Sequence, residues 1–179
     1  MEEISRRHVV ALGGAVVVAA ALPATVLAAP KKPLTITERL DRVESRTEIS
    51  ELRSRYARFA VNGDYRGVAG LFTEDCVFDG PAGPGKRAVV KGRDNLAAFL
   101  APSIGKRGAV YPLIHNEIIE VDGERATGWC MMESPTAPGF GHIVCEYHDK
   151  FARIDGRWYF TSRTMYLFLP TYEERPASA

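Results

Sequence analysis

The 179-residue sequence has no excess of positive or of negative charge, and this balance excludes some classes of function. Its 23 Lys and Arg residues balance 22 Asp and Glu residues, which leaves a net charge of +1. The basic residues are scattered among acidic ones, so no single-sign stripe of the kind that binds a phosphate backbone is present. We therefore expect no nucleic-acid partner. With 46% hydrophobic and 25% charged residues, the composition is that of an ordinary globular domain.

The sequence also has few cysteines and no cofactor motif. Cys76, Cys130 and Cys145 lie in separate apolar stretches without CxxC spacing, which indicates small core residues and no zinc site. An oxidising compartment would permit one disulfide and leave one thiol over. No HExxH or clustered His and carboxylate spacing predicts a metal, and no glycine-rich phosphate loop predicts a nucleotide. No G-x-S-x-G motif predicts a serine hydrolase. We therefore expect neither a metal nor a cofactor.

The first thirty residues differ from the rest. Arg6 and Arg7 precede the mildly apolar run VVALGGAVVVAAALPATVLA, whose end, at residues 26–28, has the small-residue pattern of a cleavage site. This segment resembles a twin-arginine export signal, which implies a periplasmic or secreted protein that contacts the membrane only before cleavage. The alternative is an uncleaved membrane anchor, since residues 9–29 have about the ~20 residues that span a bilayer.

The remaining chain begins with a helical spacing of apolar residues. The residues that recur at multiples of three or four are Leu40, Val43, Ile49, Leu52, Tyr56 and Phe59. They predict one amphipathic helix, or two that meet near Ser45, ended by Asn62-Gly63-Asp64. The run DYRGVAGLFTED predicts a second short helix, and GRDNLAAFLAPSI predicts a third with Asp94 as its cap.

From Val110 the period changes to two. Strand-like segments flank the turns Asp122-Gly123 and Asp155-Gly156, which predicts two β-hairpins. DCVFDG predicts an earlier short strand, followed by the loop PAGPGKRA. This order predicts an α+β domain in which the N-terminal helices cover the concave face of a curved antiparallel sheet, where a ligand pocket would form.

The element order, with the segments RYARFAVNGDYRGVAGLFTEDCVFDG, EIIEVDGERATG and YHDKFARIDGRWYF, resembles the SnoaL-like branch of the NTF2-like superfamily over about residues 36–168. That branch holds scytalone dehydratase, steroid Δ5-isomerase and bile-acid dehydratase. The resemblance implies a cone-shaped NTF2-like fold and a homodimer or other homo-oligomer paired through the outer sheet face. It specifies the fold better than the reaction, because this fold supports isomerases, dehydratases, hydrolases and binding-only members. The expected division is an export signal at 1–28, a linker at 29–35, a SnoaL-like domain at 36–170 and a flexible tail at 171–179.

Tyr56 stands where the resemblance implies a phenol that polarises a substrate oxygen. A phenol of pKa about 10 stays protonated at neutral pH and can donate a hydrogen bond to a developing oxyanion. On residue type alone, a core tyrosine in the stripe with Leu52 and Phe59 is the alternative. Val61 and Pro112 stand where dehydratase-like relatives carry an aspartate and a histidine, so that acid-base pair is missing here.

Strand parity supplies the other candidate catalytic residues. Asp149 shares a face with Cys145, Tyr147 and Phe151, which predicts a carboxyl in the cavity whose raised pKa keeps it neutral and able to donate. The alternative is a solvated or salt-bridged strand residue. The candidate bases are Asp79, His115 and Glu133.

The predicted pocket suits a small, largely apolar, oxygenated cyclic molecule. Its expected lining is Phe59, Phe72, Phe78, Met132, Tyr147, Trp158, Phe160 and Tyr166. The first hypothesis is a cofactor-free lyase (dehydratase) or isomerase, with Tyr56 and Asp149 as donors and Asp79 or His115 as base. The second is an exported, non-catalytic binding protein that keeps the pocket without the chemistry.

Overall fold

The computed structural model describes residues 33–83 and 85–170. The expected export signal at 1–28, residues 29–32 of the linker and the tail at 171–179 lie outside these described residues. Within the described ranges, no helix is long and apolar enough to cross a membrane.

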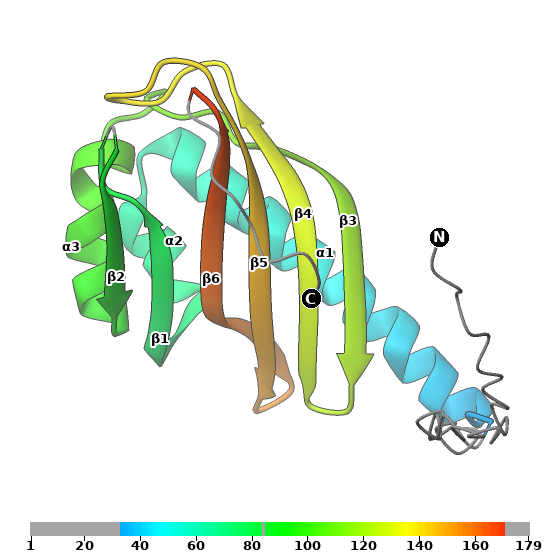
Figure 1. The fold of residues 1–179 in the computed structure, drawn as a ribbon. Helices are drawn as coiled ribbons and strands as arrows, with labels where there is room; N and C mark the ends of the chain where they lie inside the picture. Colours follow the sequence, from blue (N-terminus) through cyan, green and yellow to red (C-terminus); the bar gives the residue numbers. More distant parts are fainter. Residues whose placement is uncertain (1–32, 84, 171–179) are drawn as a thin grey trace, which may run out of the picture. The chain divides into compact units, whose positions relative to one another are not determined.

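The domain is a curved six-stranded sheet with its helices on one face (Figure 1). In chain order the elements are α1 (Ile36–Asn62), α2 (Tyr65–Gly70), β1 (Phe72–Pro81), β2 (Arg87–Lys91), α3 (Arg93–Ile104), β3 (Leu113–Asp122), β4 (Arg125–Ser134), β5 (Ile143–Ile154) and β6 (Arg157–Leu169). The strand order is β2-β1-β6-β5-β4-β3, in which β1 and β6 are parallel and all other neighbours antiparallel. The predicted α+β class is confirmed, and the parallel pair is an addition to it.

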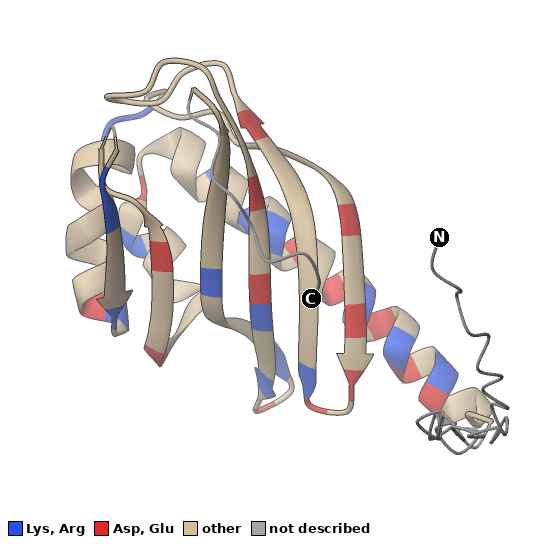
Figure 2. Cartoon of the chain, viewed as in Figure 1, with Lys and Arg blue, Asp and Glu red and all other residues tan. Residues whose placement is uncertain are grey.

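Helix α1 is one continuous helix. Thr35 begins it with a capping box, in which the Thr35 hydroxyl accepts from the Glu38 N–H and the Glu38 carboxylate accepts from the Thr35 N–H. Gly63, at φ 79°, ends it in the left-handed conformation. Leu40 and Val43, expected on the buried stripe, are 55% and 59% exposed, because the first turns of α1 extend past the sheet edge (Figure 1). Figure 2 shows mixed acidic and basic residues along this projecting part.

The two predicted hairpins are confirmed. Asp122 pairs with Arg125 across the first turn, and Ile154 pairs with Arg157 across the second. Three differences lie elsewhere. Asp94 is not the cap of α3, because Gly92 precedes the helix and Asp94 lies in its first turn. The segment predicted as the second helix is helical only to Gly70, since β1 begins at Phe72. The third difference lies after β1. The expected loop PAGPGKRA is shorter than predicted, since β2 starts at Arg87 and pairs with β1.

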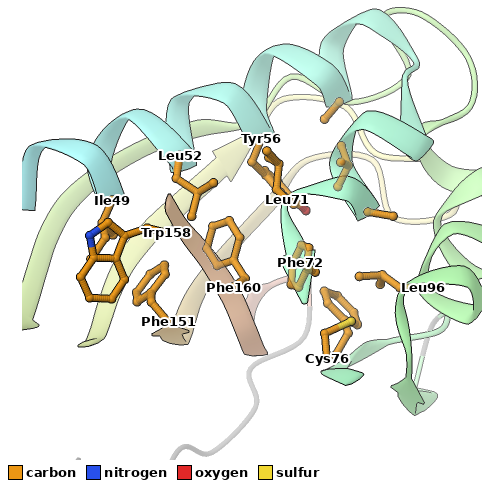
Figure 3. Close-up of a cluster of buried hydrophobic side chains, with 14 of the residues drawn as sticks. Ile49, Leu52, Tyr56, Leu71, Phe72, Cys76, Leu96, Phe151, Trp158 and Phe160 are labelled. Carbon is orange, nitrogen blue, oxygen red and sulfur yellow. The ribbon is translucent and has the colours of Figure 1, made fainter. Parts of the chain in front are cut away.

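Two groups of buried side chains fill the space between the helices and the sheet. The larger joins α1, α2 and α3 to β1 and β6, with Phe72 and Phe160 stacked at 4.8 Å (Figure 3). The smaller group lies on β4, β5 and β6 and includes Cys130, Met132 and Tyr147. All three cysteines are free and fully buried, which confirms the prediction that they are core residues.

A bulge in β6 changes which residues face the helices. Phe160 is the partner of Phe151, whereas Ser162 is the partner of Lys150, so Thr161 is the extra residue. Trp158 and Phe160 are buried before the bulge, and the buried residues after it are Arg163, Met165 and Leu167. The residues of β6 that face the interior are therefore even-numbered before the bulge and odd-numbered after it. This change places the Arg163 side chain in the interior.

Candidate functional site

A cavity lies between α3, the inner face of the sheet and the loop after β4, and we name it the phenol cavity. It is lined by Tyr56, Phe78, Pro81, Phe99, Leu100, Ser103, Ile104, Val110, Met132, Ala137, Pro138, Phe140, Ile143, Tyr147, Met165 and Leu167. Its volume is about 100 Å³. Larger hollows, of about 580 and 520 Å³, lie elsewhere and are lined mostly by charged and small surface residues. The phenol cavity is small, largely apolar and suited to a compact ligand.

Three polar side chains line the phenol cavity among the described residues: Tyr56, Ser103 and Tyr147. The Ser103 hydroxyl donates to the Leu100 carbonyl at 3.1 Å. The Tyr56 and Tyr147 rings meet edge to face, with centroids 6.2 Å apart. Burial, followed by the nearby Tyr56 phenol, raises the pKa of Tyr147 well above its usual value of 10. The Tyr147 phenol is therefore protonated at neutral pH, and it is hydrogen-bonded to the Tyr56 phenol.

The Arg163 guanidinium group packs against the rings of both tyrosines. Its guanidinium carbon lies 3.8 Å from the centroid of the Tyr147 ring and 4.4 Å from that of Tyr56. Arg163 is fully buried, and its Nη1 has no hydrogen-bond partner among the described residues. Burial has the largest single effect and lowers the pKa of Arg163, but the charge and hydrogen bonds of Asp149, together with Tyr56 and Tyr147, raise that pKa above its ordinary value. A permanently charged group thus lies against the faces of the two tyrosines.

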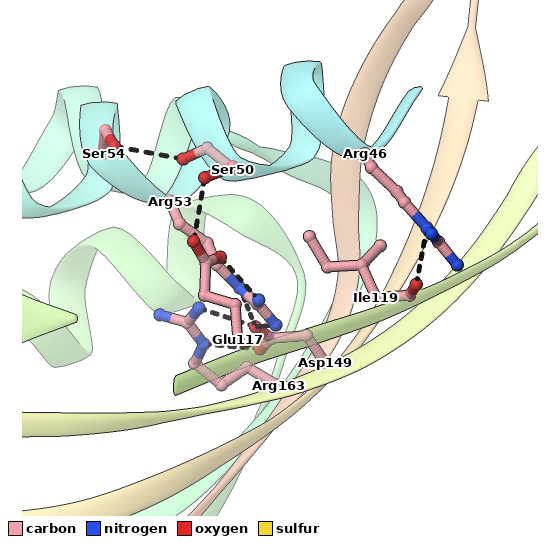
Figure 4. Close-up of polar contacts among 8 residues, drawn as sticks. All are labelled: Arg46, Ser50, Arg53, Ser54, Glu117, Ile119, Asp149 and Arg163. Carbon is pink, nitrogen blue, oxygen red and sulfur yellow. Dashed lines mark hydrogen bonds and ion pairs between the residues drawn. The ribbon is translucent and has the colours of Figure 1, made fainter. Parts of the chain in front are cut away.

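Arg163 belongs to an ion cluster of four residues, Arg53, Glu117, Asp149 and Arg163 (Figure 4). Asp149 accepts from Arg163 Nε at 2.7 Å and Nη2 at 2.9 Å, and from Arg53 Nε at 3.2 Å and Nη2 at 3.0 Å. Arg53 Nη1 donates to Glu117 at 2.8 Å. A bulge in β3, with Asn116 at φ 56°, precedes Glu117 and directs its side chain toward α1.

The expectation for Asp149 is therefore corrected. Strand parity correctly predicted that it faces the interior, where it is buried. However, it does not line the phenol cavity, and its carboxylate accepts from two guanidinium groups. It is not placed to donate to a ligand, because both of its oxygens accept hydrogen bonds from Arg53 and Arg163.

The three candidate bases lie away from the phenol cavity. Asp79 faces the opposite side of β1 from Phe78, and Arg87 Nε donates to it at 2.7 Å. His115 is exposed on β3. The Glu133 carboxylate lies 2.9 Å from Nε2 of the half-exposed His142. Of the four predicted catalytic residues, only Tyr56 lines the cavity.

The predicted lining is only partly that of the phenol cavity. Phe78, Met132 and Tyr147 line it. The other predicted lining residues lie elsewhere: Phe72, Trp158 and Phe160 in the larger core group, Phe59 half-buried against that group, and Tyr166 on the other face of β6, 5.0 Å from the His148 ring. Tyr166 was misplaced because the bulge in β6 reverses the parity after Phe160.

Sequence reasoning missed the walls contributed by α3 and by the loop after β4. Phe99 and Ile104 belong to the former, and Phe140 belongs to the latter. The apolar spacing of α3 was visible, but no signal in one sequence shows which strands that helix covers. In the described part of the chain, no three His, Cys, Asp or Glu side chains are grouped so as to hold a metal ion.

The family model of the SnoaL-like domain matches residues 41–164. This match covers most of the chain, and the chain belongs to the SnoaL-like family. No curated protein matches it.

Solved structures with the same fold agree with this assignment. An NTF2-like protein with a cystatin-like fold from Novosphingobium aromaticivorans is 26% identical, with a TM-score of 0.61 over 76% of this chain and 92% of that one. A protein of unknown function from Mycobacterium tuberculosis is also 26% identical, with a TM-score of 0.59 over 72% of this chain and 75% of that one. A third structure, from N. aromaticivorans and named provisionally as a scytalone dehydratase, is 23% identical. Its TM-score is 0.60 over 78% of this chain and 94% of that one. At that identity the likeness shows the fold alone.

Proposed function

We propose that this SnoaL-like domain binds a small, largely apolar, oxygenated ring compound in the phenol cavity. The observation that carries this proposal is the pairing of Tyr56 and Tyr147 in a lining whose other described side chains are apolar, apart from Ser103. The apolar walls would stabilise the bound ring by removing it from water, by about 25 cal/mol for each Å² buried. Tyr56, which is hydrogen-bonded to Tyr147, would fix its orientation by donating to one oxygen.

Binding is favoured over catalysis by the placement of the candidate acids and bases. A dehydratase or isomerase needs a proton acceptor within hydrogen-bond reach of the substrate. Asp79, His115 and Glu133 lie outside the phenol cavity, and Asp149 is held by two arginines.

A cofactor-free lyase or isomerase is the second candidate. The family fold includes dehydratases and isomerases, and a pair of protonated phenols is suited to stabilise an enolate oxygen. In that case Tyr56 would be the electrophilic donor. The proton acceptor would be water or an oxygen of the substrate itself.

A bicyclic ketone such as α-tetralone tests the binding proposal. Replacing Tyr56 by phenylalanine keeps the ring contacts and removes one donor, so α-tetralone should bind more weakly by about 1 to 3 kcal/mol. The melting temperature should fall only slightly, because the hydroxyl of Tyr56 makes one internal hydrogen bond, with the Tyr147 phenol. Tyr159→Phe is the matched control, since Tyr159 is half-buried outside the phenol cavity. A destabilised Tyr56→Phe variant with unaltered affinity would sink the proposal.

Hydrogen exchange separates the two candidates. In heavy water, nuclear magnetic resonance follows the exchange of the protons next to the carbonyl of α-tetralone. Acceleration by the native protein that is lost in Tyr56→Phe would favour catalysis. Saturable binding without acceleration would favour binding alone.

A further inference from the structure

The buried part of the ion cluster carries a net positive charge next to the two tyrosines of the phenol cavity. The side chains of Arg53, Asp149 and Arg163 are at most 1% exposed, whereas that of Glu117 is 27% exposed. The fully buried part thus holds two positive charges and one negative charge. The second negative charge, on Glu117, is partly exposed, so water weakens its effect without removing it. An anion at the phenol end would feel a net positive potential, which is strong in a poorly polarisable interior.

Arg163 transmits this potential through the two phenols. Its guanidinium group stacks on the faces of the Tyr56 and Tyr147 rings, and its Nη1 makes no hydrogen bond within the described residues. A cation on a ring face attracts electron density from the ring, and the attached O–H becomes a stronger donor. Burial raises the pKa of Tyr147, while the charge of Arg163 opposes that rise. Burial keeps the Tyr147 phenol neutral, and the charge of Arg163 makes it a stronger hydrogen-bond donor, as a group that faces a negative oxygen requires.

The other titratable groups near this end are neutral or lie on the other face of the sheet. Glu146 is buried on that other face of β5, where its carboxylate lies 2.6 Å from Nε2 of His148. Cys130 and Cys145 lie on the same inner face of β4 and β5. Burial raises the pKa of the Cys130 thiol to about 12 and raises that of Cys145 further, so both are neutral at physiological pH. Among the described lining residues, none from α3, β1 or β6 carries a carboxylate or an imidazole.

We infer that the phenol cavity selects ligands whose oxygen is an anion, namely phenols and enols that ionise near neutral pH and bind as phenolate or enolate. This inference rests on the proposed binding function and specifies its ligand class. Tyr56 and Tyr147 contact the anionic oxygen, and Arg163 is a positioning residue that acts through them.

para-Nitrophenol is a suitable probe, because it ionises near neutral pH and only its anion absorbs visible light. para-Nitroanisole is the matched control ligand, since methylation keeps its shape and prevents ionisation. Binding should lower the apparent pKa of para-nitrophenol by about one unit or more, which equals a tenfold preference for the anion. para-Nitroanisole should bind more weakly than the anion.

Two substitutions of opposite sign identify the cause. Glu117→Gln removes the negative charge at the surface end of the ion cluster, so the pKa of the bound probe should fall further. Arg163→Met removes a positive charge and should abolish the preference. If Arg163→Met does not fold, Glu117→Gln still decides. Glu120→Gln is the control, because Glu120 is an exposed carboxylate on the same strand.

The possible outcomes are distinct. An unchanged or raised probe pKa, with para-nitroanisole bound as well as the anion, overturns the inference and leaves the binding proposal standing. A probe pKa that ignores Glu117→Gln also overturns it, because the ion cluster would not be the cause. If neither nitro probe binds but α-tetralone does, the inference fails alone. If α-tetralone does not bind either, the proposed function fails with it.

Discussion

Replacing Asp149 with asparagine removes one buried negative charge while keeping the size of the side chain. Asp149 accepts four hydrogen bonds, two from Arg53 and two from Arg163. In Asp149→Asn the amide NH₂ would face N–H donors, and two buried guanidinium groups would lose their shared anion. Removing one partner of a buried ion pair costs about 3 to 5 kcal/mol. Since this anion serves two cations, we expect a loss at the upper end of that range.

The pair of Asp79 with Arg87 provides a matched control on the same sheet. Its N–O distance is also 2.7 Å, but its side chains are 31% and 32% exposed. Asp79→Asn should therefore cost only about 0 to 1 kcal/mol, as is usual for an ion pair in contact with water. Urea unfolding followed by tryptophan fluorescence gives both free energies, and equal m-values would show that the denatured state is unchanged.

The two variants together test the reasoning. A typical domain is stable by about 5 to 15 kcal/mol, so Asp149→Asn should bring this one close to unfolding. A loss below about 1 kcal/mol, or equal losses in the two variants, would refute the assignment of a stabilising role to the Asp149 carboxylate. The triple variant Arg53→Met, Asp149→Leu, Arg163→Met should recover much of the stability, because well-packed apolar groups can replace buried ions.

Two further predictions concern the cavity wall and the buried thiols. Gly80→Ala should weaken α-tetralone binding with little loss of stability, since the new Cβ would lie 2.7 Å from Phe78 Cε1 and push that ring into the phenol cavity. The control Gly70→Ala should change neither binding nor stability, because its Cβ would have no atom within 4 Å. Tight binding of α-tetralone by Gly80→Ala would contradict the expected position of Phe78. Burial raises the pKa of the Cys130 thiol from 9.0 to about 12. The unfolded chain therefore loses this proton at lower pH than the folded protein, so the free energy of unfolding should fall as pH rises from 9.0 to about 12. Urea titrations should show that the free energies of unfolding of the native protein and of Cys130→Ala approach each other over this pH range. A parallel pH dependence of the two proteins would contradict the prediction.

Local chemistry was sufficient to predict much of the fold. The Asp-Gly turns and the period-two segments gave both hairpins, and parity gave the inward face of β5. The position of Tyr56 followed from helical spacing with Leu52. These features depend on neighbours in the chain, which a single sequence displays.

The ion cluster could not be predicted in the same way. Arg53 follows Ile49 by four residues and precedes Tyr56 by three, so its inward position was visible, but no local pattern shows its partner. Arg163 faces inward only because of the bulge after Phe160. The hydrogen-bond partners of Asp149 are these two distant residues. The location of a bulge depends on strand pairing that the sequence does not display.

The last strand of the domain lies in the interior of its sheet. Strand β6 is hydrogen-bonded to β5 on one side and to β1 on the other, and Phe72 is the register partner of Phe160. During synthesis, the β1–β2 hairpin and the β3–β5 meander would each present an open edge until β6 leaves the ribosome. Closure of such a distant pairing is slow, since it joins residues far apart in the chain. Until then the nascent domain is open to association through these edges, and a chaperone that shields them would raise the yield of folded protein.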